Sequence, residues 1–312
     1  TITPIGESLQ NSFGGKFSGD RHVISNVQIT SGNVNVGLFG YIDCGTVMLL
    51  GVNGDISAPS GAVGGICGYG NGASIYGCYF TGTISGYNCG GIVSFDAMSY
   101  GKGVIKDCYA SAAISATSSK GGIAASTDKK LSVTNCYYDN KCSGTELGTA
   151  LTTPEMLSSD ALDKMTTTEN LWVKKATDKD SRIAYYPSFS EDNAVAVSYT
   201  TELSFVKQIP TYPAYGDIIG FNALAGLRFS GNDAAVFYDD SGDFYIKLGE
   251  RTVASSKPGS AYALSWIADC VGDVTLTLVY NNSSSEFFPA ESTKDLAINV
   301  DKKKFTVYDI NI

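Results

Sequence analysis

The sequence contains one histidine, His22, among its 312 residues. A zinc protease of the His-Glu-x-x-His type needs two histidines on one helix, so a single histidine excludes that protease core. The eight cysteines form no close Cys-x-x-Cys pair and no Cys/His pair, which argues against a zinc site. The sequence therefore predicts no metal-binding and no cofactor-binding residues.

Basic residues are scarce relative to acidic ones, with 22 lysines and arginines against 31 aspartates and glutamates and a net charge of -9. Residues 1–145 hold eight of each sign, so the remainder, with 14 basic and 23 acidic residues, carries the whole excess. Neither part has the basic stripe that binds nucleic acid or an anionic membrane. We therefore expect no nucleic-acid partner.

Long apolar runs are also missing. No run approaches the roughly 18 residues that a membrane helix needs, so we expect no membrane insertion. The chain starts at Thr1 without a methionine or a signal-like stretch, which predicts a mature fragment or a segment of a longer chain. Its 35 glycines and 19 tyrosines are typical of a β-rich protein with many turns.

Glycine-marked segments recur along the first half of the chain. Counted from Gly37, the steps to Gly65, Gly91 and Gly122 are 28, 26 and 31 residues. A period near thirty residues indicates stacked repeats rather than a closed globule. Such a solenoid offers a long surface for binding, and it does not by itself imply a chemistry.

The second half of each repeat shows the same register. Residues 47–56 align with 75–84, 105–114 and 133–138, and residues 24–29 are interpreted as an earlier, shorter version. Apolar residues fall at every second or third place, and no 3.6-residue period is visible. Stacked coils of short strands would pair each backbone with the coils above and below. We predict a right-handed parallel β-helix over residues 1–150.

The first half also resembles bacterial surface proteins that carry the GLUG motif. The resemblance rests on residues 13–27 (Phe-Gly-Gly-Lys-Phe-Ser-Gly-Asp-Arg-His-Val-Ile-Ser-Asn-Val), on residues 36–42 and on Asn-Cys-Tyr-Tyr-Asp at 135–139. Residues 152–156, 171–172 and 185–189 are similar to the closing segment of that family. Cys67, Val93 and Ala124 depart from the usual aliphatic residue or glycine, which predicts irregular later coils.

This resemblance implies a secreted or wall-attached protein, because such repeats occur beside adhesive modules and sometimes upstream of surface proteases. The family has no agreed catalytic residues to transfer to this chain. The resemblance places His22 at a turn that precedes a strand, which favours a structural role for the histidine.

Residues 151–193 are expected to form a capping segment and a linker, because the end of a β-helix exposes unpaired strands. Within it, Thr153-Pro154-Glu155 resembles a helix start, with threonine as the N-cap and proline in the first turn. Residues 190–193 read as the linker. Deletion of residues 150–190 is expected to cause aggregation or end-to-end association.

Residues 194–312 change pattern, with alternating strands predicted at 195–199, 218–221, 235–238, 244–248, 261–266, 274–280 and 295–300. Seven strands in this length indicate an antiparallel sandwich. Residues 215–217, 236–239 and 296–303 resemble bacterial Ig-like repeats. The resemblance implies that residues 302–307 lead into a further module, and that the full-length chain carries more Ig-like repeats.

Three cysteines, Cys78, Cys108 and Cys136, share one repeat position and are expected to stack along the solenoid. A column of packed, small thiols is the favoured interpretation, and disulfides between adjacent coils or a bound metal remain alternatives. Cys270 stands alone in the second module, and the others lie near turns: Cys44, Cys67, Cys89 and Cys142. Abundant free thiols on an exported protein predict a reducing habitat such as the gut.

Catalysis would need carboxylates that converge on one groove. Glycoside hydrolysis uses two acids roughly 5 to 9 Å apart, and Asp20 beside Arg21 resembles a lyase-like pair. The other acids of the repeats fall in different repeat positions: Asp43, Asp55, Asp96 and Asp107. No catalytic residue is therefore predicted.

Two further clusters have competing interpretations. Residues 239–243 are rich in oxygen ligands for calcium, but Phe244 stands where a calcium loop of the EF-hand type has glycine, and a polar hairpin turn is favoured. Exposed tyrosines such as Tyr69, Tyr87 and Tyr100 are candidates for stacking on sugar rings.

The sequence thus predicts an all-β chain: a β-helix, a capping segment and an Ig-like sandwich. We expect a bacterial cell-surface or cell-wall protein that acts as a binding stalk or adhesin for a host protein or a glycan, and not an enzyme. The alternatives are a carbohydrate-active β-helix enzyme, either a polysaccharide lyase or a glycoside hydrolase, and a noncatalytic accessory region of a surface protease. A flat polar face would favour adhesion, whereas a groove with convergent charges and aromatics would favour the enzyme.

Overall fold

The computed structural model describes residues 2–96, 102–125, 131–142, 144–145, 147–208, 213–232, 235–256 and 263–302. The chain divides into two compact units. The solenoid unit comprises Thr1–Thr177 and Ile183–Val197, and the second unit comprises Asp178–Arg182 and Ser198–Ile312. Three predictions concern parts outside the described residues: the side chain of Asp96, Tyr100, and the junction from residue 303 onward.

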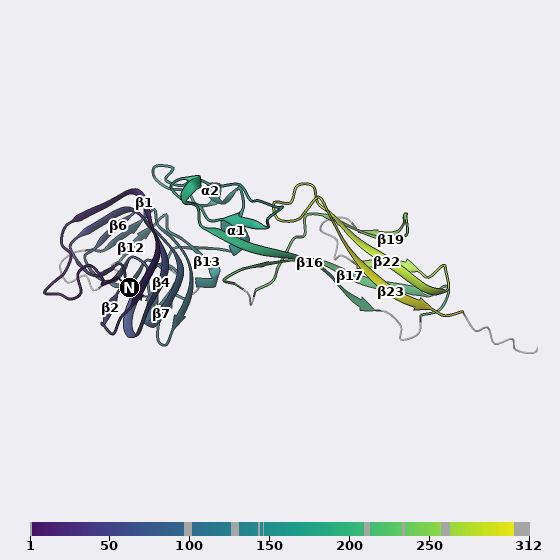
Figure 1. Cartoon of the computed structure of the whole chain (residues 1–312), viewed down its shortest axis with the longest axis horizontal. Coiled ribbons are helices and arrows are strands. Elements are labelled where there is room, and N and C mark those ends of the chain that lie inside the picture. The colour runs from purple at the N-terminus through teal and green to yellow at the C-terminus, as the bar shows by residue number, and fades with distance from the viewer. Residues whose placement is uncertain are drawn as a thin grey trace, which may run out of the picture. The chain divides into compact units, whose positions relative to one another are not determined.

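The solenoid unit is a parallel β-solenoid of about four turns, as the glycine period predicts. Its long sheet stacks equivalent strands of successive coils side by side (Figure 1): β1 (Lys16–Thr30), β4 (Thr46–Gly64), β7 (Tyr79–Gly90), β10 (Tyr109–Ala116), β13 (Tyr137–Asp139) and β14 (Thr149–Leu151).

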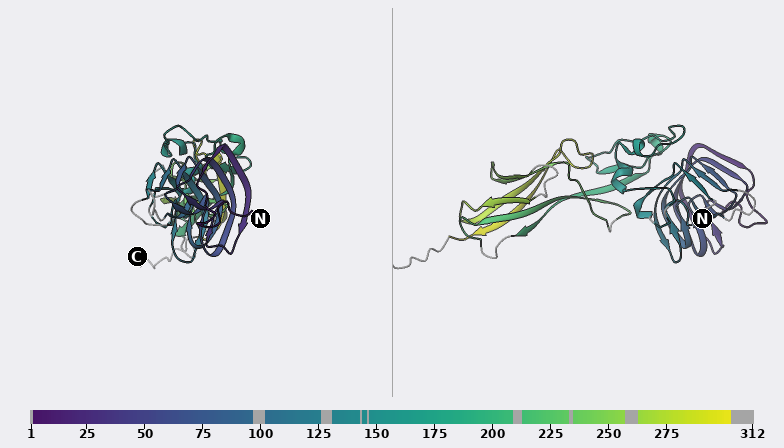
Figure 2. Two further views of the ribbon diagram at one scale, coloured as in Figure 1. Left: turned by 90° about the vertical axis from the view of Figure 1, so that its left-hand side faces the viewer. Right: turned by 180° about the vertical axis from the view of Figure 1, so that it is seen from behind.

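Shorter strands complete the coils. Equivalent segments pair through β6 (Ser74–Tyr76), β9 (Val104–Lys106) and β12 (Ser132–Thr134), while β2 (Asn35–Val36) and β11 (Lys120–Gly121) pair with β4 and β7. A separate three-stranded sheet holds β3 (Phe39–Asp43), β5 (Cys67–Asn71) and β8 (Val93–Asp96). Figure 2 shows the same stack of coils from behind, coloured purple to teal.

The core of the solenoid consists of columns of equivalent residues. Val52, Phe80, Ala110 and Tyr138 form one column, because the parallel register pairs them in sequence. The repeated glycines have a steric cause: a Cβ on Gly65 would overlap the Phe80 ring and the carbonyl oxygen of Gly91. Close approach, rather than a positive φ, therefore requires glycine at this position.

The register of the first coil differs from the predicted alignment. Residues 24–29 do not match the start of the later repeats, because Ile24 pairs with Val52 and Ile29 with Ile56. Instead, Phe17 pairs with Val47, and residues 19–21 form a corner where the next coil has only Leu49. Leu49 and its counterparts Gly77, Asp107 and Asn135 all have positive φ, which marks this corner in each coil. The sequence alignment missed this register, because the corner at 19–21 has two more residues than the equivalent corner of the next coil.

The closing segment, residues 151–177 and 183–193, holds the short helices of the solenoid unit. These are α1 (Thr153–Leu157) and α2 (Ala161–Lys164), with the single-turn 3-10 helix η2 (Glu191–Asn193) and strand β15 (Ile183–Tyr185); another such turn, η1 (Asn140–Cys142), precedes the segment. Helix α1 begins with a capping box in which Thr152, not Thr153 as predicted, is the N-cap and Glu155 is its partner. The Thr153 hydroxyl donates a hydrogen bond to Asp139.

The described residues of the second unit form two antiparallel sheets. One has β17 (Ile218–Phe229) paired with β16 (Ala196–Gln208), β18 (Phe237–Tyr238) and β21 (Ala263–Ile267). The other has the order β20 (Arg251–Ser256), β19 (Asp243–Leu248), β22 (Gly272–Asn281) and β23 (Glu291–Val300). Phe221 of the first sheet and Leu276 of the second line one small apolar cavity, so apolar faces of both sheets share a core. Strand β20 has no counterpart among the predicted strands.

Candidate functional site

One outer face of the long sheet carries a series of polar side chains. Along β4 and β7, side chains alternate between the core and this face, so that Asp55 and Ser57 point outward between Val52, Ile56 and Ala58, which are buried. The polar ladder face is defined by outward residues that are exposed or half-buried: Gln28, Thr30, Asp55, Ser57, Thr83, Ser85 and Ser115.

Hydrogen bonds between coils hold this face rigid. Asp55 accepts from Gln28 Nε2 at 2.7 Å and from Thr83 Oγ1 at 2.6 Å, and the Ser57 and Ser85 hydroxyls lie 2.8 Å apart. The hydrogen bond from Thr83, together with that from Gln28, lowers the pKa of Asp55. The face therefore presents pre-aligned hydroxyl groups and an ionised carboxylate at the spacing of the strands.

An exposed aromatic residue stands at the margin of the polar ladder face. Tyr87 continues the outward series of Thr83 and Ser85 along β7, and 51% of it is exposed. Tyr69 is less available, because its ring lies between Tyr41 and Phe95, with centroid distances of 4.8 and 5.3 Å. Two of the tyrosines predicted to stack on sugar rings lie in the described residues, and of these Tyr87 has the ring that is exposed to solvent.

A cleft of about 270 Å³ opens between the solenoid corner and the closing segment. Met48, Leu49, Tyr76 and Lys106 line its solenoid side, and Glu169 and Leu171 line the other. The peptide N–H of Thr168 donates to Asp107 Oδ1 at 3.2 Å, and Asn135 Nδ2 donates to the same oxygen at 2.9 Å. This corner cleft is therefore held open by contacts of the folded chain.

The carboxylates singled out from the sequence do not gather in one groove. Asp43 accepts from Asn71 at 2.7 Å on the small sheet, Asp55 lies on the polar ladder face, and Asp107 is buried at the corner. Asp20 and His22 lie exposed at the first corner, where His22 Nδ1 is 3.0 Å from the Gly19 carbonyl oxygen. The prediction that these acids occupy different repeat positions is confirmed for the described side chains.

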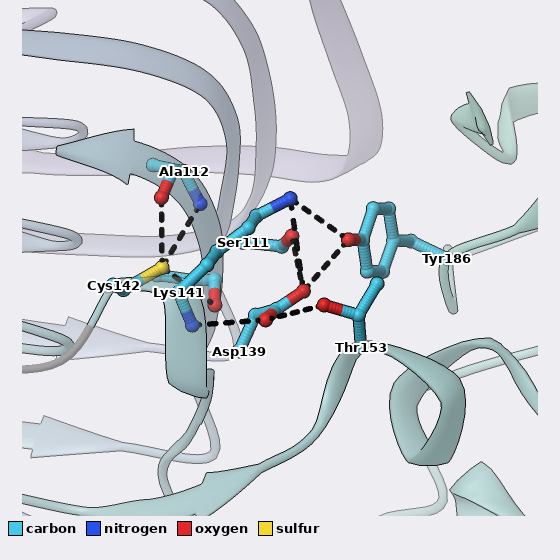
Figure 3. A network of polar contacts seen from close by, with 8 residues as sticks. Ser111, Ala112, Asp139, Lys141, Cys142, Thr153 and Tyr186 are labelled. Atoms are coloured by element: carbon cyan, nitrogen blue, oxygen red, sulfur yellow. Dashed lines mark hydrogen bonds and ion pairs between the residues drawn. The ribbon is translucent and has the colours of Figure 1, made fainter. Parts of the chain in front are cut away.

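A buried acid that the sequence did not single out joins the closing segment to the last coil (Figure 3). Asp139 is fully buried and accepts hydrogen bonds from Thr153 Oγ1 at 2.9 Å and from the Tyr186 hydroxyl at 2.8 Å. Lys141 Nζ lies 3.6 Å from Asp139 Oδ2 and donates to the Tyr186 oxygen at 3.0 Å. Because all of these groups satisfy one another, the network is a structural latch rather than an open site.

The repeated tyrosines form a second contact with the closing segment. Tyr79 and Tyr109 stack with their ring centroids 4.9 Å apart, and Trp172 packs edge-on against both. The Tyr79 hydroxyl lies 2.8 Å from Ser188 Oγ, and the Tyr109 hydroxyl donates to the carbonyl oxygen of Pro187. Successive side chains point to opposite sides of the chain. Because Cys78 and Cys108 point into the core, the tyrosines that follow them point outward and contact the closing segment.

The stacked cysteines are free thiols buried in the core. Cys78, Cys108 and Cys136 are at most 2% exposed, and the Cys108 and Cys136 thiols donate to backbone carbonyl oxygens at 3.2 Å. Burial raises the pKa of Cys108 and Cys136 well above the usual range. In the described residues no three His, Cys, Asp or Glu side chains are grouped to hold a metal ion. The geometry favours packed thiols.

The acidic stretch at residues 239–243 connects β18 of one sheet to β19 of the other, so the polar hairpin turn favoured from the sequence is wrong. Asp239 accepts from Ser241 Oγ and from Ser285 Oγ, each at 2.7 Å, and Asn282 Nδ2 also donates to it. The side-chain oxygens of Asp239 thus bind neighbouring donors in the second unit.

Comparison with known proteins gives one family match. A model of the GLUG motif matches residues 59–85, which run from the end of β4 to the middle of β7. This motif is typical of extracellular proteins and is not an enzyme motif. No curated protein and no solved structure matches the chain. Within the residues that the structure describes, every helix is too short or too polar to cross a membrane.

Proposed function

We propose that this chain is part of a bacterial cell-surface or cell-wall protein that acts as a binding stalk, an adhesin for a host protein or a glycan. In this proposal the solenoid is a right-handed β-helix that presents the binding surface. The second unit is an Ig-like sandwich that serves as a spacer, with further Ig-like repeats in the full-length protein. In this proposal both units lie outside the cell.

The polar ladder face carries this proposal. It combines Asp55, the hydroxyl ladders and the exposed ring of Tyr87 on one side of the long sheet. Hydroxyl and carboxylate groups exchange hydrogen bonds with a hydroxyl-rich ligand, and an exposed tyrosine ring adds apolar contact. The GLUG motif match at residues 59–85 supports an extracellular setting, because this motif is typical of extracellular proteins. The matched segment also builds part of the polar ladder face.

The test begins with glycan-array and host-protein binding by the full chain. Tyr87→Ala is expected to weaken binding about tenfold, since truncation of an aromatic contact residue costs about 1–2 kcal/mol. Tyr215→Ala is the matched control, because Tyr215 has similar exposure, 49%, and lies in the second unit. Equal loss in both variants, or binding of neither glycan nor host protein, contradicts the proposal.

The corner cleft keeps a carbohydrate-active enzyme as a second candidate. Its lining includes Lys106, Asp107 and Glu169 together with Tyr76. A reducing-sugar release assay, together with absorbance detection of unsaturated products, on each glycan that binds separates the two functions. Binding without release contradicts the enzyme, and release that is lost in Lys106→Ala and Glu169→Gln would replace the adhesin proposal.

A further inference from the structure

The corner cleft is lined by polar side chains that have no side-chain partner among the described residues. Tyr76, Lys106 and Glu169 line the cleft, and within the described part of the chain their side chains make no hydrogen bond or ion pair. Unused donors and acceptors grouped in a concave site are the usual mark of ligand recognition.

The remaining walls are apolar and fixed. Met48 and Leu49 line the solenoid side, and Leu171, which is 5% exposed, lines the side of the closing segment. Leu171 N donates to Thr167 Oγ1 at 3.1 Å, and Thr168 N is held by Asp107. A ligand would therefore meet a preformed site, which lowers the entropy cost of binding.

We propose that the corner cleft binds a single neutral pyranose unit of a glycan. This inference rests on the proposed binding function and adds to it a second, smaller site with a named ligand class. Adjacent sugar hydroxyls both donate and accept, so one pair can donate to Glu169 and accept from Lys106, while the C–H face of the ring lies against Met48, Leu49 and Tyr76.

The volume and the charge of the corner cleft favour a single neutral sugar ring. At about 270 Å³ the cleft lies near the lower limit of small-molecule sites, roughly 300 Å³, which suits one sugar ring rather than a longer chain. The lining holds one lysine and two acidic residues, Asp107 and Glu169, so the cleft has no positive excess to offset a sugar carboxylate or sulfate. Acidic sugars are therefore disfavoured.

The test measures binding by calorimetry and saturation-transfer NMR with the full chain. The probes are the methyl glycosides of glucose, galactose, mannose and N-acetylglucosamine, with glucuronate and galacturonate as acidic counterparts. At least one neutral glycoside is expected to bind, and the acids are expected to bind about tenfold more weakly, as a buried unpaired charge costs more than 1.4 kcal/mol. Binding of no neutral glycoside, or tighter binding of the acids, overturns the proposal.

Variants locate the site. Lys106→Ala and Glu169→Gln are each expected to weaken binding about tenfold or more, because hydrogen bonds to charged groups contribute about 1.5–3 kcal/mol. Lys102→Ala and Glu191→Gln, exposed residues outside the cleft, are the matched controls. The melting temperature is expected to be unchanged, because neither cleft side chain has a partner within the described residues. Unchanged affinity in both cleft variants overturns the proposal.

The outcomes separate this inference from the proposed function. Adhesion that persists in the full chain while no pyranoside binds, or while both cleft variants bind normally, leaves the proposed function standing and removes the cleft. Pyranoside binding that is lost in the cleft variants, in a chain that adheres to no glycan surface or host protein, supports the cleft and contradicts the adhesin.

Discussion

The Tyr186 hydroxyl donates a 2.8 Å hydrogen bond to the fully buried carboxylate of Asp139, which lies 47 residues earlier in the chain. This bond connects the closing segment with the last coil of the solenoid, and Lys141 and Thr153 complete the network. Because the carboxylate is buried, each donor lost leaves part of its charge without a partner.

Tyr186→Phe is therefore expected to lower the free energy of unfolding of the solenoid unit by about 1–3 kcal/mol, the cost of a buried acceptor left unsatisfied. Urea denaturation in a Trp266→Phe background measures this, because Trp172 then remains as the only tryptophan and lies in the solenoid unit. Tyr185→Phe, in a half-buried neighbour, is the control. An equal change in both variants would show that the bond to Asp139 contributes nothing.

Alkaline pH is expected to destabilise the solenoid unit. Burial raises the pKa of Cys89, Cys142 and Tyr79 to about 12, and burial also raises the pKa of Tyr109 and Tyr186. Unfolded cysteine and tyrosine have ordinary values of 9.0 and 10.0. The unfolded chain therefore releases these protons first as the pH rises.

The direction follows from that difference. A raised pKa in the folded state gives stability that is fully present below about pH 9 and is lost as the pH rises toward 12. Urea midpoints between pH 7 and pH 11 measure the effect, with Trp172 as the probe. A midpoint that stays constant over this range would contradict the burial of these groups.

Gly91→Ala is expected to destabilise the solenoid unit by about 1–3 kcal/mol, the usual cost of overpacking. A Cβ on Gly91 would overlap the carbonyl oxygen of Gly122 in the next coil and the Ala110 side chain. Gly32→Ala is the matched control, because a Cβ there meets no atom within 4 Å. Thermal unfolding followed by circular dichroism compares the two, and equal stability of both variants would remove the steric reason for the repeat.

The repeat itself could be predicted from the sequence because each coil must satisfy the same local constraints. Gly65 and Gly91 have no room for a side chain, and every coil repeats that restriction, so the period appears in the chain. The inward cysteines and outward tyrosines follow from alternation along each strand. The first-coil register could not be predicted, because residues 19–21 place three residues at a corner where the next coil has one.

The corner cleft and the Asp139 latch depend on long-range contacts that no local pattern records. Glu169 reaches the cleft only because the closing segment packs on the solenoid, 63 residues after Lys106. Asp139 stands in a strand with nothing in its neighbours to show that Tyr186 and Thr153 will bury it. Such sites are defined by tertiary packing and have no spacing that a sequence search could detect.

Thiol reactivity is expected to divide the eight cysteines into distinct classes. Cys44 is exposed and Cys270 is half-buried, whereas six are buried: Cys67, Cys78, Cys89, Cys108, Cys136 and Cys142. The thiolate is the reactive form, so burial and a raised pKa both slow the reaction. Ellman's reagent should label Cys44 first and Cys270 next, with the other six reacting after unfolding. A total below eight in unfolded, unreduced protein would show that disulfides are present instead.

Removal of the closing segment is expected to make the chain associate. A deletion limited to residues 152–176 spares residues 178–182, which belong to the second unit. It removes Trp172 from the rings of Tyr79 and Tyr109 and Thr166 from the Tyr137 hydroxyl, and so uncovers a column of aromatic side chains. Exposed apolar patches beside strand edges promote association.

Light scattering as a function of concentration is expected to show a growing mass for this deletion variant and a constant mass for the full chain. Circular dichroism is expected to retain a strand signal in the deletion variant, because the coils of β4, β7 and β10 keep their pairing. A variant that keeps this signal and stays monomeric would refute the capping role, since the tyrosine column would then tolerate water. Loss of the strand signal would instead place the segment within the folding core, because the coils would then need Trp172 and its neighbours in order to form.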